Sequence, residues 1–190
     1  MPGLCLRRLN ASVFLLHFML TASFLVLPTA IETVLEVPRA DHWEVYLPVL
    51  LASIAGMYPF LHLSERAGRP LPALRLAVLL LAGSLATLFL FSAPVWLYLA
   101  LCGFFAAVNF LEAVLPALVS KAVFSSGKGT ALGVYATCQF LGAFAGGASG
   151  GVVMSLAGAP GLLWLFLAAV SAWMLLIWRM PAGNLAPAPA

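Results

Sequence analysis

Six long apolar runs dominate this sequence and limit the folds that it can adopt. A membrane-spanning helix needs roughly 20 mostly apolar residues. The runs are continuous and lack the period-two alternation of a membrane β-barrel, and a helix satisfies its own backbone in hydrocarbon. We therefore predict an all-α polytopic membrane protein with six transmembrane helices in one bundle over residues 1–179. The predicted spans are about residues 11–31, 43–62, 73–92, 95–119, 129–155 and 161–179.

The composition supports a lipid environment. Hydrophobic residues make up 64% of the chain and charged residues 8%, with a mean hydropathy of +1.09. A soluble domain has about 25% charged residues. The three cysteines are too far apart for a disulfide framework or a metal site, so we predict no metal and no cofactor. We predict no nucleic-acid partner either, because the positions of the basic residues explain the net charge of +3.

Basic residues predict the orientation, since Lys and Arg concentrate in cytoplasmic loops. Eight of the nine basic residues fall on one side of the predicted spans, which is therefore predicted to be cytoplasmic. Arg39 falls between the first two spans and is predicted to lie outside. We expect both termini in the cytoplasm. The basic residues on the predicted cytoplasmic side are Arg7, Arg8, Arg66, Arg69, Arg75, Lys121, Lys128 and Arg179.

The two ends of the chain need separate interpretation. A basic start, an apolar centre and a small-residue end make residues 7–30 similar to a cleaved signal peptide as well as to a first span. We favour the span, because the apolar part is longer than usual and contains His17 and Thr21. Residues 180–190 are rich in Pro and Ala, which predicts a disordered tail.

Glu112 is the one acidic residue deep inside a predicted span, since Glu44 stands at the very start of the span 43–62. It precedes Lys121 by nine residues, or about 13 Å of helix. A carboxylate at that depth costs ~2.5–3.5 kcal/mol, so we expect it to face the bundle interior and to have a partner. Glu112 is a proton-coupling candidate, and the alternative is a carboxyl group that only joins two helices.

Four further polar residues within predicted spans are expected to line a cavity. For His17 the favoured role is a hydrogen bond between helices. These residues are Asn109, Tyr135, Gln139 and His17.

Residues 128–151 hold seven of the sixteen glycines. Small residues let helix backbones approach closely in lipid, where packing replaces the hydrophobic force. At 100° per residue the glycines form two stripes, which predicts two docking surfaces on one helix. The first stripe is Gly142, Gly146 and Gly150, and the second is Gly133, Gly147 and Gly151.

Several segments resemble one transporter family. The segments "NFLEAVLPALVSK" and "GKGTALGVYATCQFLGAFAGGASGG" resemble spans ten and eleven of major facilitator superfamily transporters, in the YajR-type bacterial drug-efflux-like group. "RRLNASVFLLHFMLTASFLVLP" and "DHWEVYLPVLLASIAGMYPF" are similar to spans seven and eight. "SERAGRP" resembles the core of the superfamily's cytoplasmic signature loop, with Leu61 where the signature begins with glycine. The matching loop residues are Glu65, Arg66, Gly68 and Arg69.

The resemblance implies half of a twelve-span fold. The six spans would form two inverted three-helix repeats, corresponding to the C-terminal half. Glu65 would then lack its family partner, a helix end of the opposite half, within this chain. A separate N-terminal-half chain or a homodimer would complete the structure.

We therefore predict a half-size or truncated transporter of this superfamily in the bacterial inner membrane. It would export a small organic solute in exchange for protons, with lipid, solute and protons as its partners. The alternative is a non-transporting membrane module or gene fragment that needs a separate N-terminal half. An enzyme is not predicted, because the sequence has no HExxH pair, two-aspartate constellation or readable Ser/His dyad.

Overall fold

The computed structural model describes residues 2–180, and these residues form helices with no strand. Five helical segments are long and apolar enough to cross a membrane. The all-α polytopic prediction is confirmed at this level, while the predicted tail 180–190 lies outside the described residues except for Met180. The long helices are α1 (Pro2–Ser23), α3 (His42–Leu61), α4 (Pro70–Leu90), α5 (Pro94–Lys121) and α6 (Lys128–Trp178). The short ones are α2 (Leu27–Val34), η1 (Arg39–Asp41), η2 (His62–Arg66) and η3 (Ser125–Gly127).

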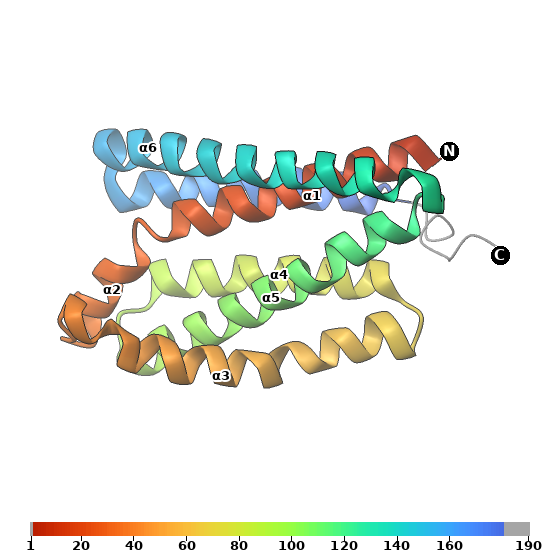
Figure 1. Ribbon diagram of the computed structural model, residues 1–190. Helices are drawn as coiled ribbons and strands as arrows, with labels where there is room; N and C mark the ends of the chain where they lie inside the picture. Colours follow the sequence, from red (N-terminus) through yellow and green to blue (C-terminus); the bar gives the residue numbers. More distant parts are fainter. Residues whose placement is uncertain (1, 181–190) are drawn as a thin grey trace.

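Helix α6 reverses direction at Gly158, which has φ +63° and ψ −160°. Glycine adopts this positive φ without steric cost, and Pro160 suits the first turn of the helix that follows. We call residues 128–157 the first arm and residues 159–178 the second arm. Figure 1 shows the two arms, teal and blue, lying side by side rather than end to end. The second arm returns to the start of α1, where the Arg8 guanidinium donates to the Arg179 carbonyl.

The first predicted span differs from the structure. We expected one segment over residues 11–31, whereas α1 begins at Pro2 and ends at Ser23, and α2 begins at Leu27. Pro28 occupies the first turn of α2. Proline lacks the N–H that a continuous helix would use and is tolerated in a first turn, so the chain restarts there.

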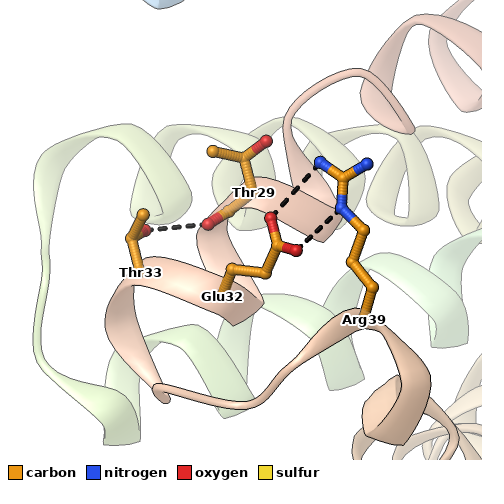
Figure 2. A network of polar contacts seen from close by, with 4 residues as sticks. All are labelled: Thr29, Glu32, Thr33 and Arg39. Carbon is orange, nitrogen blue, oxygen red and sulfur yellow. Dashed lines mark hydrogen bonds and ion pairs between the residues drawn. The ribbon is translucent and has the colours of Figure 1, made fainter.

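An ion pair between Arg39 and Glu32 joins η1 to α2 (Figure 2). The Arg39 guanidinium donates to both carboxylate oxygens of Glu32, at 2.7 and 3.3 Å. The Thr33 hydroxyl donates to the Thr29 carbonyl at 2.8 Å. This two-point contact holds residues 35–38 as a short loop, in which Glu36 has a positive φ of 57°.

Helix α5 is the centre of the bundle. It packs against α1, α3, α4 and α6 and crosses α4 obliquely in Figure 1. Its buried side chains include Phe104, Phe110 and Leu111. By contrast, α3 keeps much of its apolar surface exposed, as at Trp43 and Leu51. Residues of α5 are therefore placed to meet side chains from several helices.

Two arginines cap the C-terminal end of α6. Arg75 of α4 donates to the carbonyls of Ile177 and Trp178, at 3.3 and 2.9 Å, and its guanidinium lies 4.9 Å from the Trp178 ring centroid. Arg8 of α1 donates to the Arg179 carbonyl. Carbonyls at a helix C-terminus have no partner inside the helix and carry partial negative charge. From the sequence we interpreted these arginines only as markers of membrane orientation. In the structure they also connect the end of α6 to α1 and α4.

Candidate functional site

Glu112 of α5 and His17 of α1 are in contact. The Nε2 atom of His17, on α1, lies 3.2 Å from Oε1 of Glu112, on α5. The His17 side chain is 9% exposed and the Glu112 side chain is 45% exposed. Glu112 thus has the expected partner, but it does not lie in the bundle interior as predicted. Nothing among residues 2–180 covers nearly half of its side chain.

The Nδ1 contact of His17 determines which ring nitrogen faces Glu112. Nδ1 lies 3.1 Å from the Val13 carbonyl, which can only accept, so Nδ1 carries a hydrogen. In a neutral imidazole Nε2 is then an unprotonated acceptor. Its contact with Glu112 therefore needs a proton, either on the carboxyl group or as a second proton on the imidazole.

Tyr135 completes this group from the first arm of α6. Its side chain is buried and lies within electrostatic reach of Glu112. Gln139, one turn further on, is partly exposed and forms no recorded hydrogen bond with a described residue. The structure thus brings together His17, Glu112 and Tyr135.

Asn109 lies one turn before Glu112 but has a different partner. Its amide donates to the Ser53 hydroxyl at 2.8 Å, and that hydroxyl donates to the Leu50 carbonyl at 2.7 Å. Asn109 therefore ties α5 to α3. Sequence reasoning missed Ser53, although it is a small polar residue within an apolar run, which is a usual sign of a contact between membrane helices.

The first glycine stripe lies against α1. Ideal Cβ atoms at Gly142 and Gly146 would overlap the backbone carbonyls of Phe14 and Phe18. At Gly150 a Cβ atom would lie 2.9 Å from a Leu25 methyl group. This close approach brings α1 and the first arm together, and with them His17 and Tyr135.

The second stripe has no comparable neighbour in the described chain. A Cβ atom would meet no heavy atom within 4 Å at Gly133 or Gly151, and at Gly147 it would make an ordinary 3.4 Å contact with Thr21. We predicted two docking surfaces, and among residues 2–180 the helix uses one. The helical period gives the direction of a stripe, but not whether a neighbouring helix occupies it.

The signature-like loop has an ion pair that the sequence did not predict. Oε1 of Glu65 lies 3.7 Å from Nζ of Lys121 at the end of α5, so Glu65 has a partner within its own chain. Both side chains are about half exposed, and an exposed pair contributes ~0–1 kcal/mol. Gly68 has a φ of +62°, a backbone conformation that favours glycine at this turn. Arg66 and Arg69 are exposed.

The described residues include no group of three His, Cys, Asp or Glu side chains that could hold a metal ion. The polar chemistry of the bundle is centred on the carboxyl group, the imidazole and the phenol described above.

Comparison with curated proteins finds relatives over most of the chain. It is 33% identical over 187 residues to the inner membrane transport protein YajR of Escherichia coli (strain K12), which covers 97% of this chain and 39% of that protein. It is 31% identical over 150 residues to an uncharacterized transporter of Buchnera aphidicola subsp. Baizongia pistaciae, covering 78% and 38%. No family model matches.

These relatives confirm the resemblance that the sequence motifs predicted. The chain spans less than two fifths of the length of these two proteins. Together with its long apolar helices, the likeness identifies a multi-pass membrane protein.

Proposed function

We propose that this chain is the C-terminal half of a major facilitator superfamily transporter in the bacterial inner membrane, and that it takes part in proton-coupled export of a small organic solute. The names of its relatives support transport and the location. The reversal at Gly158 supports six crossings, because each arm of α6 is long enough to span a bilayer. Helices α1, α3 and α4 would form one three-helix repeat, and α5 with the two arms the other.

The contact between His17 and Glu112 carries the proton-coupling part of the proposal. Because Nδ1 is committed to the Val13 carbonyl, the pair holds one proton when Nε2 bonds the carboxyl group. Loss of that proton leaves a carboxylate facing a lone pair at a depth where charge is costly. Proton release therefore favours water or a solute beside Glu112, and proton uptake favours the closed contact.

The exposed part of Glu112 supports a second half beside this one. A carboxyl group 45% exposed within the bilayer is expected to face another protein surface or a water-filled cavity rather than lipid. A separate N-terminal-half chain or a second copy of this chain would supply that surface. The same exposure of Glu112 also fits the rival function, a membrane module that does not transport. This chain by itself would form only one wall of such a cavity.

The test of proton sharing requires no knowledge of the solute. We would measure proton uptake and the infrared band of protonated carboxyl groups in the purified chain and in its Glu112→Gln variant. The amide can replace the hydrogen bonds of a protonated carboxyl group but cannot carry the proton, so the variant should fold and lose the infrared band of the protonated carboxyl group. Glu65→Gln is the matched control, because it removes a half-exposed carboxylate in the cytoplasmic loop. The band should persist in Glu65→Gln, and an unchanged band in Glu112→Gln would refute a protonated carboxyl group at this pair.

Transport itself is tested by co-expression. Proton flux into vesicles would be measured, with a panel of organic solutes, for this chain alone and together with an N-terminal six-span chain. We expect flux with both chains, none with this chain alone unless it forms homodimers, and none when Glu112→Gln replaces the native chain. Flux that persists with Gln at position 112 would make Glu112 structural. No flux from a folded complex would favour the non-transporting module.

A further inference from the structure

A groove separate from the proton site lies at the end of the bundle where the arginines cap α6. It is an open groove with a volume of about 600 Å³, and it is lined by α1 and both arms of α6. Phe14 and Leu15 of α1, Cys138 of the first arm and Leu176 of the second form its apolar walls. The volume lies within the 300–1,000 Å³ range of ligand pockets. Neither His17 nor Glu112 lines it.

The polar end of the groove contains a cation and an orphaned oxygen. Arg7 is exposed at its rim, and no carboxylate among residues 2–180 pairs with it. Asn10 lies one turn further along α1, and its Oδ1 atom is buried with no hydrogen-bond partner in the described chain. A buried acceptor without a donor costs ~1–3 kcal/mol. Arg8 and Arg179 add positive charge at the same end.

These features define the chemistry of an occupant. The occupant needs an anionic group that pairs with Arg7 and a hydroxyl or amine that donates a hydrogen bond to Asn10. It also needs an apolar tail that covers the walls between Arg7 and Leu15, about 12 Å along α1. Water would satisfy Asn10 but not the apolar walls. A cavity between membrane helices with basic residues at the cytoplasmic side is a typical site for an anionic head group.

We propose that this groove binds a phospholipid with an anionic, hydroxyl-bearing head group, such as phosphatidylglycerol. Its phosphate lies beside Arg7, a head-group hydroxyl donates to Oδ1 of Asn10, and one acyl chain lies along Phe14 and Leu15. The bound lipid fills the space between α1 and the two arms. This inference is independent of whether the chain transports a solute.

Native mass spectrometry of the purified, delipidated full chain tests the proposal. Phosphatidylglycerol and phosphatidylcholine with the same acyl chains would be titrated separately. We expect one phosphatidylglycerol to bind saturably and phosphatidylcholine to bind about tenfold more weakly, because both lipids carry the phosphate but choline has no hydroxyl donor for Asn10 and brings a positive charge toward Arg7. Arg7→Gln should weaken phosphatidylglycerol binding and reduce this preference, whereas Arg69→Gln, which removes an exposed arginine outside the groove, should leave both unchanged.

A second pair of variants tests the groove itself. Ala172→Trp places an indole in the groove and should prevent binding, whereas Ser171→Trp adds the same side chain on another exposed face of the second arm. Equal binding of the two phospholipids by the native chain would overturn the proposal. Equal phosphatidylglycerol binding by the two tryptophan variants would also overturn it. If Ala172→Trp fails to fold, the Arg7→Gln comparison still decides the result.

Discussion

Gly146→Ala should separate α1 from the first arm of α6, although it adds a single methyl group. The added Cβ atom would lie 2.7 Å from both the carbonyl carbon and the Cα atom of Phe18, whereas an ordinary contact is 3.4–4 Å. The two backbones must therefore move apart by at least about 0.7 Å, the difference between 2.7 and 3.4 Å, because the Phe18 carbonyl oxygen lies closer still to the added atom. Overpacking of this kind costs ~1–3 kcal/mol. For a chain of this size, that cost corresponds to a lower melting temperature by about 2–12 °C.

Gly151→Ala is the matched control, because it makes the same change in the same helix where a Cβ atom meets nothing within 4 Å. The assay is thermal unfolding in mild detergent, followed by the loss of the monodisperse peak in size-exclusion chromatography. We expect Gly151→Ala to melt within a few degrees of the native chain, since alanine is also the better helix former by about 1 kcal/mol. Equal melting temperatures for the two variants would refute the assignment of the first stripe as the packing surface.

Three further predictions follow from the polar contacts and the orientation. Asn109→Leu should lower stability by ~0.6–1.7 kcal/mol, the range of a hydrogen bond between membrane helices; the same loss in a Ser53→Ala background would show that the bond to Ser53 does not carry it. Arg75→Leu should cost ~1–3 kcal/mol in detergent melting, because it leaves the carbonyls at the end of α6 without their donor, and an unchanged melting temperature would exclude this cap. A reporter joined at residue 190 should be active in the cytoplasm and one inserted beside Arg39 in the periplasm, and the reverse pattern would invert the proposed topology.

The sequence by itself was sufficient for the all-α class and for most helix positions. A continuous apolar run near 20 residues, without period-two alternation, must be a helix in lipid, because only a helix or a closed β-barrel satisfies the backbone hydrogen bonds there. Helix α3 at residues 42–61 and α5 at residues 94–121 therefore lie close to the predicted runs. The exception was the break between α1 and α2, where Pro28 begins a new helix within an apolar segment.

The tertiary structure determined which residues of different helices contact one another. Helical periodicity placed Glu112 and the glycine stripes on particular faces of their helices, but a face acquires a neighbour only when the helices pack together. Packing joined Glu112 to His17 on α1, and Glu65 to Lys121 on α5. It also covered Gly146 with α1 and left Gly151 open. Each contact joins residues more than 50 positions apart in the chain, which is a distance that local sequence periodicity does not reach.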